Sequence, residues 1–361
     1  TQGDGLIAYE QEDKKTQAQS RRGRCQHHVM GMRRRSMSTE EVNDTLSCVP
    51  CAERRLPPEV YLFLYMSTAA VVLLTACGNL LVIVSVCHFK QLHTPTNLLI
   101  LSLAVADFLM GILVMPFQMS FTIEPCWMFG FVLCEIYKLC SMQLTVVSIF
   151  NVTLIAVDRY ISLYIPFHYS NVVTLRVILT TVLCTWTFSS LYSVCLLYFN
   201  RFCQSTQACP GECFFIMNQT LYICDLLFIF ILPSATIITL YMKIFIMARK
   251  HVVAIRAVIQ PTNHQSKAPR SEHKAAKALS VVVGVFMAAL LPYYISSMLT
   301  DFIDEQAFTI MVNCFSILFC FNSTINPVIY ALFHPWFQKS VKLILTRQIF
   351  NPDSSLKNVI S

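Results

Sequence analysis

The sequence predicts an all-α membrane protein, a seven-transmembrane helix bundle followed by a short amphipathic eighth helix. Of its 361 residues, 55% are hydrophobic and only 13% are charged, and the mean hydropathy is +0.56. The apolar residues gather in runs long enough to cross a hydrocarbon core of about 30 Å, which takes about 20 residues of helix. Polar or proline-containing segments separate seven such spans, which lie at 59–87, 97–122, 131–163, 174–198, 216–247, 275–299 and 307–333.

Charge on the segments between the spans predicts the orientation. The segment after the fifth span is rich in lysine and arginine and contains one carboxylate, Glu272, whereas the segment after the sixth span holds Asp301, Asp304 and Glu305. Because cytoplasmic loops carry an excess of positive charge, we expect the basic segment inside and the N-terminus outside, in a multi-pass plasma-membrane protein. The net charge of +7 is attributed to these loops and not to nucleic-acid binding.

The polar ends complete the division of the chain. No apolar core follows the basic residues near the start, so no secretory signal peptide is predicted there. Residues 1–36 are expected to be a disordered upstream extension, with Met37 as a natural start, and Asn43 begins a glycosylation sequon. The stretch from His334 onward is amphipathic and is expected to lie on the inner leaflet. The predicted units are an extracellular tail, the bundle, helix 8 and a cytoplasmic tail, at 1–57, 58–333, 334–348 and 349–361.

Polar residues inside the spans are candidates for function because they are costly in a membrane. Asp107 lies deep in the second span with no lysine or arginine near it in sequence. We expect it to join a hydrogen-bonded network that holds the helices together. Since oxygen ligands then surround a carboxylate, we also expect the network to bind sodium. The polar residues proposed to surround Asp107 are Asn79, Ser148, Asn322, Ser323 and Asn326.

Asp225 lies on the outer half of the fifth span, before Pro233. A carboxylate there must face the bundle interior or a water-filled cavity, and its natural partner is a cation, which predicts a ligand ammonium group. The alternative is a structural aspartate that is protonated, hydrogen-bonded or paired with Lys138. Tyr293 and Tyr294 supply aromatic faces for a bound cation.

The third span ends in Asp158-Arg159-Tyr160. One interpretation is an interfacial charge pair that extends to the membrane surface. The other is a latch with two arrangements, in which Arg159 pairs with Glu272 in the inactive state.

The sixteen cysteines form no zinc-type grid of closely spaced pairs. On the oxidising outer side, Cys134 and Cys213 are the strongest disulfide pair. A second bridge from Cys209 to Cys48 or Cys51 stays open, because sequence does not fix the connectivity. The chain has no nucleophile-and-base arrangement, phosphate loop or HExxH motif, so no enzyme is predicted.

These features, one or more in each span, resemble the rhodopsin-like (class A) G-protein-coupled receptors over residues 58–348. The residues that carry the resemblance are Gly78-Asn79, LSLAVADF ending at Asp107-Phe108, Cys134, Asp158-Arg159-Tyr160, Trp186, Pro233, Pro292 and Asn326-Pro327-Val328-Ile329-Tyr330. Further stretches are similar to the trace amine-associated receptors: HFKQLHTPTNLLILSLAVADFLMGILVMPF, the CWMFG that starts at Cys126, FNSTINP and the PWF that starts at Pro335.

The resemblance implies an amine ligand that enters from outside and a heterotrimeric G protein of the stimulatory or olfactory type inside. It also implies the Arg159–Glu272 lock, the Cys134–Cys213 bridge and a set of activation residues. That set comprises Asp158, Arg159, Tyr160, Glu272, the relay Pro233–Ile149–Phe286, Tyr241, Asn326, Pro327 and Tyr330.

Three departures from the family pattern agree with one another. Ser141 stands where aminergic receptors have the aspartate that binds the amine, and Cys320 stands where they have its supporting tyrosine. Leu290 replaces the tryptophan two residues before Pro292. Asp225 stands where a serine is common, which resembles some fish trace amine-associated receptors and implies an amine held from the fifth span, in inverted orientation.

The leading hypothesis is therefore an olfactory amine receptor that raises cyclic AMP, with no cofactor except an allosteric sodium ion. Its expected ligand-binding residues are Asp225, Ser141, Met142, Thr145, Phe215, Tyr293, Tyr294 and Cys320. An orphan receptor for a non-amine ligand, with Asp225 structural, is the alternative within the fold. A transporter would show internal repeats, and a light sensor would need a lysine in place of Cys320.

Overall fold

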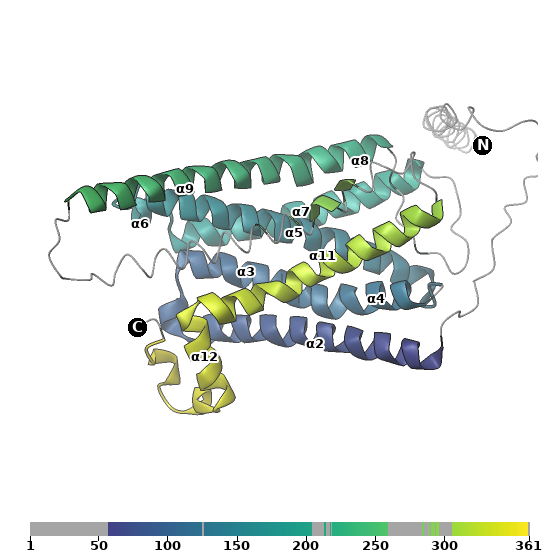
Figure 1. The fold of residues 1–361 in the computed structure, drawn as a ribbon, viewed down its shortest axis with the longest axis horizontal. Helices are drawn as coiled ribbons and strands as arrows, with labels where there is room; N and C mark the ends of the chain where they lie inside the picture. Colours follow the sequence, from purple (N-terminus) through teal and green to yellow (C-terminus); the bar gives the residue numbers. More distant parts are fainter. Residues whose placement is uncertain are drawn as a thin grey trace, which may run out of the picture.

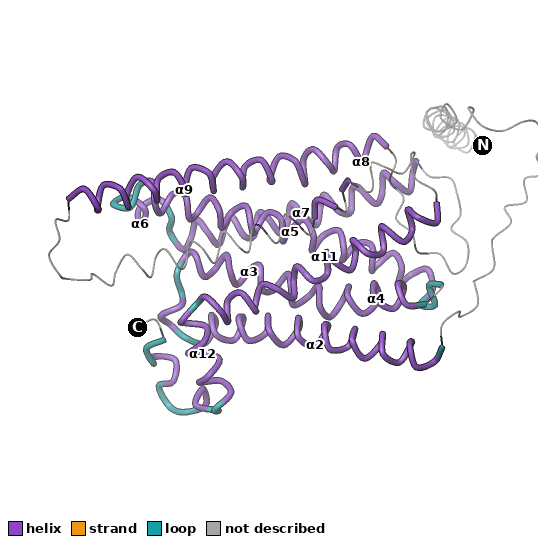
Figure 2. The backbone as a smooth tube through the Cα atoms, in the orientation of Figure 1, coloured by secondary structure: helices purple, strands orange, loops and turns teal. Residues whose placement is uncertain are grey.

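The computed structural model describes residues 57–124, 126–203, 213, 217, 219–258, 284, 288, 290–292, 294, 295 and 305–359. Its described part is a bundle of long helices with no strand (Figure 1, Figure 2). In chain order the elements are α2 (Pro58–His88), η1 (Lys90–Leu92), α3 (Pro95–Leu109), η2 (Met110–Val114), α4 (Met115–Ile123), α5 (Gly130–Tyr164), α6 (Tyr169–Val172), α7 (Leu175–Cys203), α8 (Gln219–Asp225), η3 (Leu226–Ile231), α9 (Leu232–Val258), α11 (Glu305–Phe333), α12 (Pro335–Leu345), η4 (Gln348–Phe350) and η5 (Ser354–Leu356).

The helices follow the apolar runs. Among the described residues, five stretches are long and apolar enough to cross a membrane: Pro58–His88, Pro95–Ile123, Gly130–Tyr164, Leu175–Arg201 and Gln219–Met247. α11 occupies the seventh predicted span, and the described residues of the sixth span are helical. Such runs form helices because only intrahelical hydrogen bonds satisfy the backbone in lipid. α9 continues past the predicted end at residue 247, as far as Val258.

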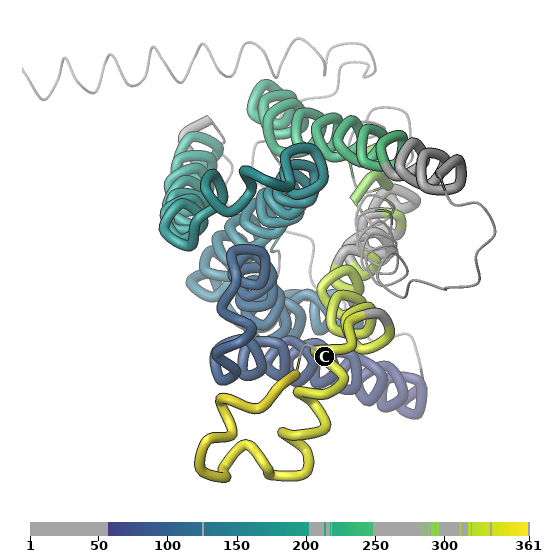
Figure 3. The backbone as a smooth tube through the Cα atoms, turned by 90° about the vertical axis from the view of Figure 1, so that its left-hand side faces the viewer, coloured from purple at the N-terminus to yellow at the C-terminus, as the bar shows by residue number. Residues whose placement is uncertain are grey.

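The third span, α5, is the axis of the bundle. It contacts α3, α7 and α9, and α11 returns to lie beside α2, so the last described span closes the bundle against the first (Figure 3). Buried apolar residues of the spans form one main core, to which α5 contributes Val146, Ile149, Val152, Ile155 and Ala156.

Two spans contain a widened turn immediately before a proline. η2 and η3 are π-helical, and each ends two residues before a proline, Pro116 and Pro233 respectively. Proline has no N–H and its ring clashes with the carbonyl four residues earlier, and a wider turn accommodates both effects. Asp107 lies three residues before η2, and Asp225 immediately precedes η3. Both buried aspartates of these spans are therefore next to an irregular turn.

α2 and α11 approach closely at Gly78. A Cβ atom built on Gly78 would lie 2.8 Å from Cγ and 3.0 Å from Cβ of Pro327. Glycine therefore permits the contact between the first and last spans, because any larger residue would collide with the proline ring.

The chain end forms a small lobe on one end of the bundle (Figure 1). The predicted helix 334–348 is shorter in the structure: α12 ends at Leu345. Its Trp336 and Leu343 pack on a buried cluster of Phe89, Leu92 and Val359. Beyond α12 the tail folds back, since Val359 N donates to Gln91 Oε1 at 3.2 Å and His88 Nε2 lies 3.0 Å from Ser354 Oγ.

Candidate functional site

Asp225 is at the meeting point of three spans. Its side chain, on α8, is only 6% exposed. Tyr192 Oη donates to Oδ1 at 2.6 Å, and Tyr294 Oη donates to Oδ2 at 3.3 Å. Tyr192 comes from α7 in the fourth span and Tyr294 from the sixth span. The carboxylate is thus held between two tyrosine hydroxyl groups.

Tyr294 makes two further contacts with the fifth span. Its ring stacks on that of Phe230, with centroids 4.3 Å apart and planes 19° apart. Its backbone carbonyl accepts a hydrogen bond of 2.8 Å from Tyr222 Oη. Tyr294 is therefore fixed to the fifth span through its hydroxyl, its ring and its backbone.

One alternative for Asp225, pairing with Lys138, does not occur. Lys138 Nζ lies 3.2 Å from Glu135 Oε1, one turn away on α5, and the oxygens of Asp225 accept from tyrosines instead. A local pair three residues apart on one helix competes well because the two side chains are neighbours on its surface.

The expected facing wall lies on α5. Ser141, Met142 and Thr145 are partly buried there. Thr145 Oγ1 donates to the Ser141 carbonyl at 2.7 Å, so its proton is used within the helix. Gln143, which the sequence did not single out, donates through Nε2 to Ser190 Oγ of α7 at 2.8 Å and links the third and fourth spans.

Cys320 of the seventh span is 1% exposed and packs in an apolar cluster that includes Met115, Leu144 and Val147. Leu290 is also buried, in the main core. Phe215 and Tyr293, both expected to bind the ligand, lie outside the described residues.

The Gly130 end of α5 is fixed by a disulfide bond. Cys134 and Cys213 are bonded, as predicted, with Cα atoms 5.8 Å apart. Trp127 packs against both cysteines and donates through Nε1 to the Gly130 carbonyl at 2.8 Å. Gly130 has φ +77°, a conformation that favours glycine.

Cys126 is also disulfide-bonded, which sequence reasoning missed. The sequence marks it only as the first residue of CWMFG, although its place just before Gly130, where α5 begins, puts it beside Cys134 and Cys213. The predicted partners of the second bridge, Cys209 with Cys48 or Cys51, lie outside the described residues, as does Asn43.

Asp107 is 1% exposed and forms a buried polar network. Ser323 Oγ donates to its Oδ1 at 2.8 Å, and Asn326 Nδ2 donates to its Oδ2 at 2.6 Å. Asn79 Nδ2 donates to the Ser323 carbonyl at 3.0 Å, so the first, second and seventh spans are joined. Asn322 is buried as well, but the hydrogen bonds to Asp107 come from Ser323 and Asn326.

Several buried polar atoms remain without a hydrogen-bond partner among the described residues. They are Asn79 Oδ1, Ser148 Oγ, both side-chain polar atoms of Asn151, Ser193 Oγ and Tyr241 Oη. Asn151 was not predicted, although a polar residue one turn after Ser148 on the same helix is a readable signal. Buried polar atoms are normally satisfied, so these mark places where an ion, water or ligand would be stabilised.

Near the Tyr164 end of α5, Asp158 is buried, and its carboxylate interacts with three side chains. Arg159 pairs with it directly and also contacts Thr96 Oγ1. Thr96 Oγ1 donates to Asp158 Oδ2 at 2.8 Å, and Tyr169 Oη donates to Oδ1 at 2.6 Å. Burial, followed by the hydrogen bond to Asp158, raises the pKa of Tyr169, so its hydroxyl stays a donor.

The structure describes some, but not all, of the remaining residues predicted to act in activation. Ile149 and Pro233 are buried, and Tyr330 lies at the end of α11 with its ring 5.6 Å from that of His334. Tyr160 stacks on Tyr164. Glu272 and Phe286 lie outside the described residues, so the predicted lock and relay stay predictions.

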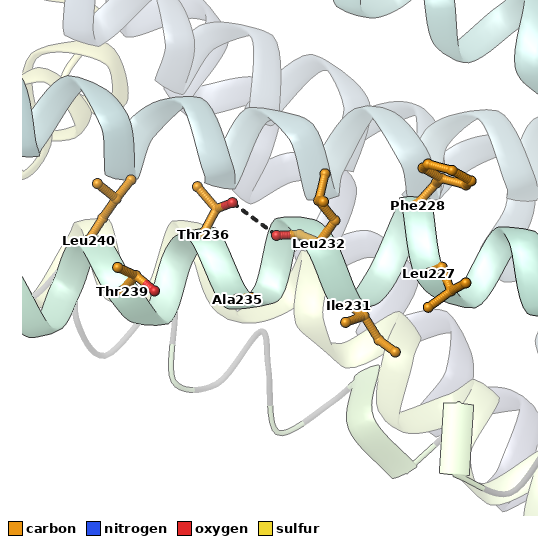
Figure 4. A pocket seen from close by; sticks show the side chains of 8 residues that line it. All are labelled: Leu227, Phe228, Ile231, Leu232, Ala235, Thr236, Thr239 and Leu240. Carbon is orange, nitrogen blue, oxygen red and sulfur yellow. Dashed lines mark hydrogen bonds between the residues drawn. The ribbon is translucent and has the colours of Figure 1, made fainter.

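A separate groove runs along η3 and α9 (Figure 4). All its lining side chains come from this one stretch: Leu227, Phe228, Ile231, Leu232, Ala235, Thr236, Thr239 and Leu240. The Thr236 hydroxyl donates to the Leu232 carbonyl at 2.9 Å and is satisfied within the helix. A groove lined by exposed leucine and phenylalanine on the outside of a membrane bundle is suited to lipid, and Asp225 is not part of it.

Comparison with known proteins identifies the family of this chain. Residues 78–330 match the family described as 7 transmembrane receptor (rhodopsin family). The chain is 36% identical over 338 residues to trace amine-associated receptor 13c of Danio rerio, an alignment that covers 90% of this chain and 99% of that receptor. It is 37% identical over 326 residues to trace amine-associated receptor 8a of Rattus norvegicus, with coverage of 86% and 94%.

A human relative is trace amine-associated receptor 2, which is 33% identical over 340 residues, with coverage of 90% of this chain and 94% of that receptor. The chain therefore belongs to the trace amine-associated receptors of the rhodopsin family. It is a multi-pass plasma-membrane receptor, not an enzyme, and the family implies a small-molecule ligand and a heterotrimeric G protein.

Proposed function

We propose that this receptor binds amines through Asp225 and signals through a stimulatory or olfactory G protein to raise cyclic AMP. The observation that carries the proposal is a carboxylate buried between the fourth, fifth and sixth spans, with hydrogen bonds from tyrosines and without a cationic partner among the described side chains. A buried charge is retained at a cost, which a ligand cation would offset.

The hydrogen bonds to Asp225 leave lone pairs of its carboxylate to accept from an ammonium group. A carboxylate has about four lone-pair sites, and the hydroxyls of Tyr192 and Tyr294 use one on each oxygen. The remaining sites suit an N–H donor, and the nearby ring of Phe230 suits the apolar body of an amine. Ser141 on the facing span has no charge to compete for the ammonium group.

The proposal is tested by measuring cyclic AMP in cells exposed to an amine panel, with Asp225→Asn compared with wild type. Charge-assisted hydrogen bonds contribute about 1.5–3 kcal/mol, so the substitution should reduce amine potency about 10-fold to 150-fold. Glu135→Gln is the matched control, because Glu135 is an outer carboxylate already paired with Lys138. Unchanged amine potency in Asp225→Asn would exclude Asp225 as the anchor.

A second candidate is a receptor for a non-amine ligand in which Asp225 is structural. The two tyrosine hydrogen bonds favour it, since they satisfy Asp225 without a ligand. This candidate predicts activation by neutral odorants and a lower thermal stability of Asp225→Asn, with no response to any amine.

We further propose that the Asp107 network binds sodium. The residues fit such an ion, because Asp107 supplies charge and the orphaned oxygens Asn79 Oδ1 and Ser148 Oγ are hard ligands. Asn79 is tied to Ser323, which donates to Asp107, and Ser148 lies on α5, which packs against α3. A bound ion would offset the burial of the carboxylate.

A further inference from the structure

Tyr294 is the point at which the described part of the sixth span is attached to the ligand site. It makes three contacts with the fifth span: its hydroxyl with Asp225, its ring with Phe230 and its carbonyl with Tyr222. Leu290, one helical turn earlier and buried, has no aromatic ring or polar group with which to sense a ligand. Among the described residues of the sixth span, Tyr294 therefore has the side chain suited to link this span to a ligand.

We propose that the Tyr294 hydroxyl holds the sixth span to Asp225 in the ligand-free receptor, and that a ligand ammonium releases this span by taking its place on Oδ2. This inference rests on the proposed function of Asp225 as the amine anchor. Tyr294 thus couples ligand binding to the sixth span, a role that Leu290 cannot fill because its side chain is neither aromatic nor polar.

The two tyrosine hydrogen bonds to Asp225 are unequal. Tyr192 donates over 2.6 Å, whereas Tyr294 donates over 3.3 Å, beyond the usual range for a hydroxyl donor. The longer bond is the weaker one, so an incoming ammonium displaces Tyr294 more easily than Tyr192. Tyr192 then keeps the carboxylate oriented while the sixth span is released.

The other contacts of Tyr294 determine how the sixth span moves once the hydroxyl is released. The stacked ring of Phe230 and the Tyr222 hydroxyl do not involve the ligand carboxylate, so they persist and leave the sixth span free to pivot about them. A ligand shifts an equilibrium only through a difference in its interactions with the two states. Here that difference is the competition for a single carboxylate oxygen.

The experiment compares three tyrosine-to-phenylalanine variants of the full receptor in nanodiscs, normalised to the amount of folded receptor. Ligand-free nucleotide exchange is measured on a panel of heterotrimeric G proteins. Tyr294→Phe keeps the ring that stacks on Phe230 and removes only the hydroxyl, and it should raise basal exchange about threefold to tenfold. Tyr192→Phe removes the other hydrogen bond, and its basal exchange should stay below that of Tyr294→Phe. Tyr198→Phe, an exposed residue of α7, should match wild type.

The double variant separates coupling from a general loss of structure. Asp225→Ala removes the acceptor of the Tyr294 hydroxyl, so it should raise basal exchange by itself, and adding Tyr294→Phe should raise it no further. Because exchange is normalised to the amount of folded receptor, a single variant that folds in lower yield still contributes to the cycle. Basal exchange of Tyr294→Phe equal to that of Tyr198→Phe overturns the inference, as does an equal rise in Tyr192→Phe or additive effects in the double variant.

Failure of the inference is distinguishable from failure of the proposed function. If amines activate wild type and Asp225→Asn is insensitive to them while Tyr294→Phe has wild-type basal exchange, the anchor stands and the coupling role of Tyr294 is wrong. If no amine activates wild type, the amine displacement step is wrong, whatever the basal exchange of the variants.

Discussion

Replacing Gly78 by alanine should destabilise the receptor through a collision between its first and seventh spans. The new Cβ would lie 2.8 Å from Cγ of Pro327, and carbon atoms attract each other best at about 3.5–4.0 Å. The intrusion is thus at least about 0.7 Å, onto a ring held within α11. Overpacking of this kind costs about 1–3 kcal/mol, whereas alanine gains up to about 1 kcal/mol over glycine from its helix propensity.

Gly284→Ala is the control that isolates the steric cost. No atom of the described residues lies within 4 Å of a Cβ built on Gly284, so we expect this variant to have only the propensity gain. The difference in free energy of unfolding between the two variants should be about 1–3 kcal/mol, seen as a gap of several degrees in the melting temperature of purified receptor in detergent. Equal melting temperatures would refute the close contact between α2 and α11.

Three further predictions concern the Cys134–Cys213 bond, His334 between α11 and α12, and the Asp107 network. Cys134→Ser opens the bond between residues 79 apart and should cost about 2–5 kcal/mol, so that surface labelling falls, whereas Cys184→Ser, an exposed free cysteine, should leave it unchanged. Burial, then the charge of Arg159, lowers the pKa of His334. As the pH falls, the unfolded chain therefore takes up a proton at about pH 6.5, before the folded chain does, and the free energy of unfolding decreases below that pH. His334→Gln should remove this part of the pH dependence of the melting temperature. Replacing sodium by choline should change amine potency in wild type but not in Asp107→Asn.

One specific result would contradict each of these three predictions. Equal surface labelling of the two cysteine variants would exclude a stabilising role for the bridge. A melting temperature of His334→Gln that falls with acidification as steeply as that of wild type would exclude the histidine as the titrating group. A sodium effect that persists in Asp107→Asn would place the ion elsewhere.

The positions of the spans could be predicted from sequence because each apolar run must satisfy its backbone within itself. The two widened turns could not be predicted, because proline in a helix can be accommodated by a kink, a break or a π turn, and neighbouring packing selects among them. The end of α12 at Leu345 likewise depends on how the tail folds back over Phe89 and Leu92.

In the candidate site, too, some residues could be predicted from sequence and others depended on packing. Asp225 and Tyr294 were identifiable because a carboxylate and a tyrosine beside a proline stand out in apolar spans. Tyr192 was not identifiable, because it lies 33 residues from Asp225 and its contact depends on how α7 is rotated against α8. The sequence also allowed Lys138 as a partner of Asp225, but Lys138 pairs with Glu135, which lies on the same helix and needs no tertiary packing to reach it.

The π-helical turn beside Asp225 has a consequence for how such receptors are aligned. A π turn holds one residue more than an α turn, so η3 acts as a one-residue insertion in the fifth span. Since an α-helix turns about 100° per residue, a span of the same length that stayed α-helical through Leu226–Ile231 would have Asp225 rotated by about that angle relative to Pro233 and away from both tyrosines. Two receptors with the same spacing between Asp225 and Pro233 would therefore present different faces of the span to the ligand if only one of them had the widened turn, and an alignment without gaps would not reveal the difference.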